Sequence, residues 1–293
     1  MSSVAVQTLV AGGASEAMTG RRMMDKVEIR DDQLVSMDAI APGLHGLRIT
    51  FVNVFGVEHP DGGWTLVDAA IPYSAAIIKR WAEKKFGRGP RAIVLTHGHF
   101  DHVSAAAELS REWNVPVYAH RLEFPYLTGE REYPKPNVGA GGGMMSLLSP
   151  LYPRGPVDLR PRLEELGAEV SEAVMPRWKL LETPGHTPGH VSFWREEDRV
   201  LIPGDAFCTT KPESFFEAAL AQKPEVHGPP SYFTSDWNAA GASVRKLAGL
   251  NAEVVAPGHG RPMAGAGVAE ALRELADRFG EVAVPENVKH EAA

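Results

Sequence analysis

A short stretch of sequence, THGHFDH at residues 96–102, constrains this chain more than any other feature. Its first residue, Thr96, is also the last residue of the apolar run AIVLT, which predicts a buried strand. Side chains two residues apart point the same way in an extended segment, so His97 and His99 can share one metal ion. A turn into a following helix would re-aim Asp101 and His102 toward a second ion beside the first. The alternative, a set of loop histidines that cap helices, is the weaker interpretation.

Three later turns each carry one further metal-ligand type directly after an apolar run. They are PGHTPGH at 184–190, GD at 204–205 and PGHG at 257–260, and each has a glycine that lets the backbone approach a crowded centre. A single histidine after a strand is more often a structural residue. Three such turns, in order after the first motif, predict a site for two metal ions instead. The seven expected ligands are His97, His99, Asp101, His102, His186, Asp205 and His259.

Strand-like and helix-like patterns alternate along the chain. The β-branched run at 48–57 and the run WTLVDA, separated by a turn at 61–63, predict a hairpin. Apolar residues at three- and four-residue spacing predict a helix over 72–86. Further strands are expected at 92–96, 115–119, 168–174, 178–182, 190–195, 199–203 and 253–256, and further helices at 103–113, 236–248 and 264–279.

The domain organisation is predicted as an N-terminal arm, residues 1–40, followed by one catalytic domain, residues 41–293. The arm lacks the basic start and strong apolar run of a signal peptide. No segment reaches the length of a membrane span, so we expect a soluble, cytoplasmic protein without a membrane partner. A Gly- and Pro-rich insertion at 128–162 carries several large apolar residues, and we expect a lid or a contact within a homodimer there.

The charge of the chain bears on its partners. A formal net charge of -7 argues against binding to nucleic acid, because phosphate contacts require a basic surface. A small-molecule substrate is expected instead. The single cysteine, Cys208, cannot form an intramolecular disulfide, which agrees with a reducing compartment.

From about residue 45 to residue 280, the sequence resembles the metallo-β-lactamase superfamily, on the THGHFDH motif and the three ordered turns. The resemblance implies an α/β fold, a four-layer αββα sandwich with the metal site along one edge. It implies a first metal held by His97, His99 and His186. It implies a second metal held by Asp101, His102 and His259, with Asp205 bridging the two.

Two further residues have roles that the sequence leaves open. Asp68, at the end of WTLVDA, matches the family's early aspartate, which supports the ligand loop by hydrogen bonds. The alternative is an aspartate that caps the turn before Pro72. His190, four residues after His186, is expected to form hydrogen bonds within its turn rather than to bind metal.

The resemblance also narrows the branch of the family. The commonest β-lactamase subclass carries Cys where this chain has Asp205 and lacks the histidine at position 102. The pattern is more similar to glyoxalase II and the lactonases. Two departures count against those enzymes themselves, since residues 260–293 are too short for the glutathione-binding extension and Cys208 stands where lactonases place a catalytic tyrosine.

The expected reaction follows from the ligands. A water shared by two divalent ions is acidified and supplies hydroxide at neutral pH, which would attack an ester, lactone or thioester carbonyl. Asp101 or Asp205 would orient this nucleophile and carry its proton. Zinc suits these donors best, and manganese or iron also fits them. The alternatives are a mononuclear iron persulfide dioxygenase and a phosphodiesterase on the same fold.

Several aromatic residues lie near the expected bridging aspartate in the sequence. These residues either wall an apolar substrate pocket or belong to the ordinary core, and the core is slightly favoured. The candidates are Phe207, Phe215, Phe216, Tyr232 and Phe233.

Overall fold

The first half of the chain builds a seven-stranded mixed sheet in the order β1-β2-β3-β4-β5-β6-β7. Neighbours pair antiparallel from β1 to β4 and parallel from β4 to β7. In the computed structural model, the described residues are 34–137, 139, 147, 149–151, 158–211 and 224–291. The strands are β1 (Leu34–Ala41), β2 (Leu44–Ile49), β3 (Val52–Glu58), β4 (Trp64–Val67), β5 (Ile93–Val94), β6 (Val117–Ala119) and β7 (Leu163–Glu165).

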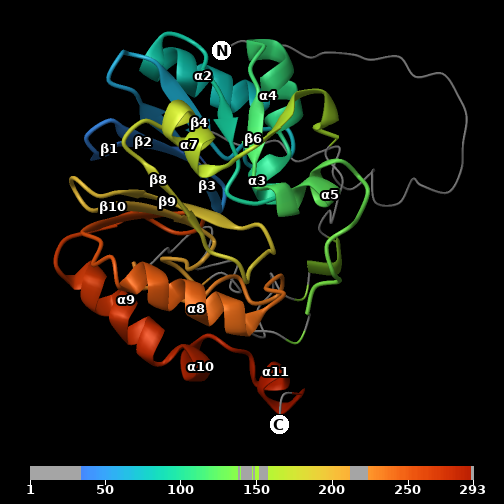
Figure 1. The fold of residues 1–293 in the computed structure, drawn as a ribbon, viewed down its shortest axis with the longest axis vertical. Coiled ribbons are helices and arrows are strands. Elements are labelled where there is room, and N and C mark those ends of the chain that lie inside the picture. Colours follow the sequence, from blue (N-terminus) through green and yellow to red (C-terminus); the bar gives the residue numbers. More distant parts are fainter. Residues whose placement is uncertain are drawn as a thin grey trace, which may run out of the picture.

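The second half builds a five-stranded sheet in the order β12-β11-β10-β9-β8. Only β10 and β11 pair parallel, and the other neighbours are antiparallel. This sheet lies beside the first, with its strands drawn from yellow to red in Figure 1. Its strands are β8 (Lys179–Glu182), β9 (Val191–Arg195), β10 (Val200–Gly204), β11 (Val254–Pro257) and β12 (Met263–Ala264).

Helices cover the outer face of each sheet (Figure 1). Helices α2 and α4 pack on the first sheet, and α8 and α9 pack on the second. The long helices are α2 (Ala75–Phe86), α4 (Ala106–Trp113), α8 (Trp237–Ala248) and α9 (Gly267–Asp277). The short ones are α3 (Phe100–Val103), α5 (Phe124–Leu127), α7 (Ala168–Val174), α10 (Phe279–Val282), α11 (Glu286–Glu291), and the 3₁₀ turns η2 (Arg121–Glu123), η3 (Ser149–Leu151) and η4 (Arg160–Arg162).

Three apolar clusters hold these layers together. One lies between the first sheet and its helices, and one lies between the second sheet and α8 and α9. The third joins the two sheets face to face, with Phe55 and Val67 from the first sheet against Phe193 and Ile202 from the second. Burial of these side chains is the main force that stacks the layers. The expected α/β fold, an αββα sandwich, is therefore confirmed.

Several predicted elements differ from the observed ones. The strand expected at 168–174 is helix α7, whose alanine and glutamate residues favour helix once tertiary contacts allow it. The strand expected at 48–57 is split by a turn, where Thr50 adopts a φ of 60°, into β2 and β3. The hairpin of β3 and β4 is confirmed.

The predicted domain boundaries fall partly outside the described residues. Residues 34–40, assigned to the arm, belong to β1, and residues 1–33 are not described. Most of the insertion between 138 and 157 is also not described, so a lid or dimer contact there stays a prediction. Among the described helices, none is long and apolar enough to cross a membrane.

Candidate metal centre

The predicted ligands converge where strands of both sheets end. His97 and His99 follow β5, and the adjoining helix α3 carries Asp101 and His102. The other three come from the second sheet. His186 lies in the turn between β8 and β9, Asp205 follows β10, and His259 follows β11. All seven side chains are buried, with at most 6% of any residue exposed.

Asp205 lies at the centre of this cluster. Its Oδ2 is 3.0 Å from His259 Nε2, 3.5 Å from His102 Nε2 and 3.6 Å from His186 Nε2. Asp101 Oδ2 lies 3.4 Å from the same His259 nitrogen. Ligand atoms fall into three groups whose members lie within 4.8 Å of one another. The groups are His97, His99 and His186; His97, His102 and Asp205; and Asp101, His102 and His259.

Hydrogen bonds fix the tautomers of two ligands from the first sheet. His102 Nδ1 donates to Asp68 Oδ2 over 2.8 Å. The hydroxyl of Thr96 donates to the same carboxylate and therefore accepts from His97 Nδ1. Both rings consequently use Nδ1 in a hydrogen bond and turn Nε2, the atom that would bind a metal, into the site. Without a metal, burial acts to lower the pKa of His102, but the carboxylates of Asp205 and Asp68 outweigh it and raise that pKa well above its usual value.

Two predicted ligands from the second sheet also use Nδ1 in a hydrogen bond and turn Nε2 toward the site. The hydroxyl of Thr234 donates to the carbonyl of Pro230, so it accepts from His186 Nδ1 at 3.0 Å. His259 Nδ1 donates to the carbonyl of Phe51 over 2.9 Å. His99 differs, because its Nδ1 lies 2.9 Å from His186 Nε2 and is the ring atom turned toward the site.

A divalent cation fits the buried polar atoms that make no hydrogen bond at this centre. His97 Nε2, His102 Nε2 and Asp205 Oδ1 are buried and make no hydrogen bond among the described residues. Such orphaned atoms are costly unless something binds them. Imidazole nitrogens and carboxylate oxygens in this number are the ligands that zinc and neighbouring transition metals prefer. The residues therefore fit a metal chemically as well as in spacing.

Burial and mutual charge set the protonation of the ligands. Burial lowers the pKa of His97 and of His186 well below the usual value, and lowers that of His99 to about 3. These three rings are neutral at pH 7, as metal binding requires. Burial acts to raise the pKa of Asp205, but His259 and His102 outweigh it and hold that pKa well below the usual range. Burial raises the pKa of Asp101.

His190 lies beside the cluster with both ring nitrogens already in use. Its Nε2 accepts the backbone N–H of Asp205 at 2.9 Å, and its Nδ1 lies 2.9 Å from the hydroxyl of Thr183. The hydroxyl of Ser192, which donates to Pro203, accepts in turn from Thr183. His190 therefore holds the turn that presents Asp205 and has no free nitrogen for a metal.

Two residues that hydrogen-bond to the turns of the predicted ligands carry no sequence signal. Asn53, in β3, donates its side-chain amide to the carbonyls of Pro257 and Gly260, and so ties the His259 turn to the first sheet. Glu123 accepts from the backbone N–H groups of two glycines in different ligand turns. Both side chains act on backbone far away in sequence, so no local motif could have revealed them.

The structure describes only some of the residues of the predicted aromatic pocket. Phe207 is fully buried in the cluster beneath α8 and α9, which leaves no ring surface for a substrate, and Tyr232 is 5% exposed. Phe215 and Phe216 lie outside the described residues. Two half-buried rings do flank the ligands: Phe233 lies 4.9 Å from His99 between ring centroids, and Phe51 is stacked on His259 at 6.0 Å.

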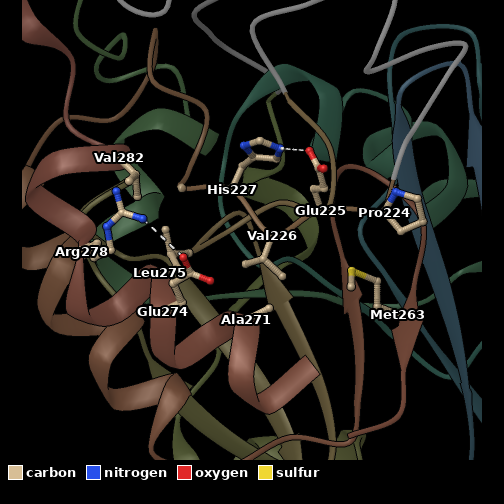
Figure 2. Close-up of a pocket in the computed structure, with 11 residues that line it drawn as sticks. Pro224, Glu225, Val226, His227, Met263, Ala271, Glu274, Leu275, Arg278 and Val282 are labelled. Carbon is tan, nitrogen blue, oxygen red and sulfur yellow. Dashed lines mark hydrogen bonds and ion pairs between the residues drawn. The ribbon is translucent and has the colours of Figure 1, made fainter. Parts of the chain in front are cut away.

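A cavity of about 410 Å³ lies elsewhere, between the 224–228 segment and helix α9 (Figure 2). His227 and Glu225 face each other across its upper rim, and Arg278 pairs with Glu274 on the helix side. None of the residues that line it is a predicted metal ligand. The cavity therefore does not mark the metal centre.

Comparisons with known proteins agree with this geometry. A family model, the metallo-beta-lactamase superfamily, matches residues 47–259. Probable metallo-hydrolase YflN of Bacillus subtilis (strain 168) is 42% identical over 246 residues, or 83% of this chain and 93% of the relative. Hydroxyacylglutathione hydrolase GloC of Haemophilus influenzae is 27% identical over 39% of this chain and 49% of its own.

A solved structure, that of TTHA1623 in a di-iron-bound form, is 27% identical with a TM-score of 0.50, and the match covers 73% of this chain and 89% of that one. The family match spans most of the described residues and includes every predicted ligand. On the fold, the ligand cluster and these relatives together, the chain belongs to the metallo-β-lactamase superfamily.

Proposed function

We propose that this chain is a metal-dependent hydrolase that cleaves an ester, lactone or thioester bond of a small molecule with two bound divalent cations. The observation that carries the proposal is the position of Asp205, whose Oδ2 lies within 3.6 Å of nitrogens from three imidazoles. One of these imidazoles, His186, belongs to one ligand group, and His102 and His259 belong to another. A carboxylate shared in this way suits a pair of cations.

The ligand groups divide between two metal positions. His97, His99 and His186 would hold one cation, and Asp101, His102 and His259 the other, with Asp205 between them. Zinc suits the mixture of imidazole and carboxylate best, while iron and manganese suit the same donors. The di-iron form of a relative that is 27% identical supports iron as a second choice.

The residues around the cations would divide the work of hydrolysis. When bound, the cations acidify a water and polarise the carbonyl that it attacks. Asp205, whose pKa lies well below its usual range even without a metal, would bind between the cations and orient the attacking water. Asp101, the other carboxylate of the cluster, would orient the water or carry its proton alongside Asp205. Phe51 and Phe233 present apolar surface beside the ligands and exclude competing water.

A substrate panel tests this proposal. Metal-loaded protein would be assayed against lactones, thioesters, aryl esters and phosphodiesters, and oxygen uptake would be followed with a persulfide. We expect turnover of at least one carboxylic ester, lactone or thioester, which is lost in His97→Ala. The identity to hydroxyacylglutathione hydrolase GloC makes thioesters the first class to try. Oxygen uptake with one iron per chain, or turnover of phosphodiesters alone, would contradict the proposal.

A further inference from the structure

Glu123 is a buried carboxylate that lies between the two turns supplying three of the ligands. It ends the 3₁₀ turn η2 and is 0% exposed. Its Oε2 accepts the N–H of Gly98 at 2.9 Å, and its Oε1 accepts the N–H of Gly189 at 2.7 Å. The hydroxyl of Tyr133 donates to Oε2 as well. One side chain thus spans two segments that belong to different sheets.

Each of the two glycines lies in a turn that carries predicted ligands. Gly98 separates His97 from His99, and Gly189 lies in the turn that carries His186. A Cβ added at Gly98 would lie 3.1 Å from Glu123 Oε2 and overlap the Tyr133 hydroxyl. A Cβ added at Gly189 would lie 2.9 Å from Glu123 Oε1. The absence of side chains at both positions is what allows the backbone to reach the carboxylate.

The chemistry of this contact favours a charged, rigid link. Two backbone N–H groups and the Tyr133 hydroxyl donate to Glu123, and an ionised carboxylate has acceptor oxygens for all three. Burial raises the pKa of Glu123, and these hydrogen bonds oppose that rise. Charge-assisted hydrogen bonds of this kind are shorter and stronger than neutral ones. An amide of the same shape would turn an N–H group toward one of the backbone donors and lose that bond.

We propose that Glu123 is a positioning residue that fixes the spacing of His97, His99 and His186 and thereby sets the metal affinity of that three-histidine position. The proposal rests on the proposed function, because it assumes that the cluster binds metal. The second position is less dependent on Glu123, because its ligands Asp101 and His102 lie on α3 and His259 is held by Phe51. Changing Glu123 should therefore lower the affinity for one of the two bound metal ions and leave the affinity for the other nearly unchanged.

The test is a chelator-competition titration of metal-free protein with Zn²⁺, in which the two equivalents are fitted separately. Glu123→Gln should weaken one equivalent about 10- to 100-fold, the usual effect of losing a hydrogen-bonded support of a metal ligand, and change the other less than about threefold. Tyr133→Phe should give a smaller loss, because both backbone donors remain. Glu123→Asp should recover part of the affinity, because it keeps the charge.

Two controls separate positioning from general stability. Glu130→Gln removes a nearby exposed carboxylate and should change neither equivalent. Leu272→Ala removes a buried side chain of α9 and should lower the melting temperature of the metal-free protein while leaving both affinities intact. A folded Glu123→Gln variant that binds both equivalents as the wild type does would overturn the proposal. If that variant does not fold, unchanged affinity in Tyr133→Phe would overturn it instead.

The outcome for the wild type keeps the two proposals apart. A wild-type chain that binds no Zn²⁺ contradicts the proposed function and, with it, the role of Glu123. A wild-type chain that binds two equivalents while Glu123→Gln is indistinguishable from it contradicts only the positioning role. Loss of both equivalents to the same degree in a folded Glu123→Gln variant also contradicts it, because the proposed link acts on one position.

Discussion

Asp68 Oδ2 lies 2.8 Å from His102 Nδ1, and both side chains are buried. The same carboxylate accepts the backbone N–H and the hydroxyl of Thr96, each at 2.8 Å. Asp68 adopts a φ of 61°, a left-handed conformation that aspartate tolerates better than most residues. This one side chain therefore orients the strand end, the THGHFDH turn and one imidazole together.

Asp68→Asn is expected to weaken metal binding about 10- to 100-fold, because an amide has one acceptor oxygen for three donors. The affinity would be measured by chelator competition, and the folded state checked by circular dichroism. Asp61→Asn is the matched control, since Asp61 is an exposed carboxylate that pairs with Arg91. Equal metal affinity in Asp68→Asn and wild type would show that Asp68 only caps its turn.

Gly258→Ala is expected to abolish metal binding on steric grounds alone. A Cβ there would overlap Asp205 Oδ1 and lie 2.7 Å from His102 Cε1, although Gly258 does not have a positive φ. Metal content after gel filtration checks the result. Gly167→Ala is the control, because a Cβ at Gly167 meets nothing within 4 Å. A Gly258→Ala protein that keeps its metals would show that the centre can shift to accommodate a methyl group.

His190 makes the stability of the metal-free protein depend on pH. Burial lowers its pKa to about 4, whereas an unfolded chain has a histidine pKa of about 6.5. Between these values the unfolded state binds more protons, so this contribution to the free energy of unfolding is complete above about pH 6.5 and is lost as the pH falls to 4.

The slope due to one such group is at most about 1.4 kcal/mol per pH unit. His190→Gln should therefore show a shallower loss of stability between pH 6.5 and pH 4 than the wild type, measured by urea unfolding at a series of pH values. The other buried imidazoles contribute in both proteins, so the difference reports His190 alone. Identical slopes would mean that the pKa of His190 is the same in the folded and the unfolded protein.

Phe233→Ala is expected to raise the KM for substrates with a large apolar group several-fold, with unchanged metal content, because its half-buried ring lies beside His99. Phe207→Ala should affect stability rather than KM. It should lower the free energy of unfolding by about 3–5 kcal/mol, the usual cost of a truncated core phenylalanine, without a change in KM. Unchanged KM in Phe233→Ala for every apolar substrate would place the binding surface elsewhere.

The seven side chains that converge at this centre were predictable because each lies in a short local pattern. The strand AIVLT runs directly into the histidine motif, and the later turns each follow a run that forms β8, β10 or β11. Glycine beside each ligand reflects crowding that the structure shows at Gly258. The stacking of two sheets between layers of helices entered through resemblance to a family, and the order of the strands was not predicted.

The parts that could not be predicted depend on contacts between distant segments. Asn53 acts on carbonyls at 257 and 260, and Glu123 acts on an N–H at 189, so neither has a local signature. Helix α7 was predicted as a strand because a seven-residue segment is too short for its periodicity to decide. Phe207 could not be separated from a pocket residue because burial is a property of the packed fold.

Metal stoichiometry decides between this account and its alternatives. Elemental analysis would be carried out on the wild type and on Asp205→Ala, each purified without chelator and reconstituted with Zn²⁺ in parallel. We predict close to two equivalents per chain in the wild type and a loss of both metal and hydrolysis in Asp205→Ala. A wild-type preparation that holds no stoichiometric metal and still hydrolyses its substrate, or an Asp205→Ala protein that retains both metal and activity, would contradict it.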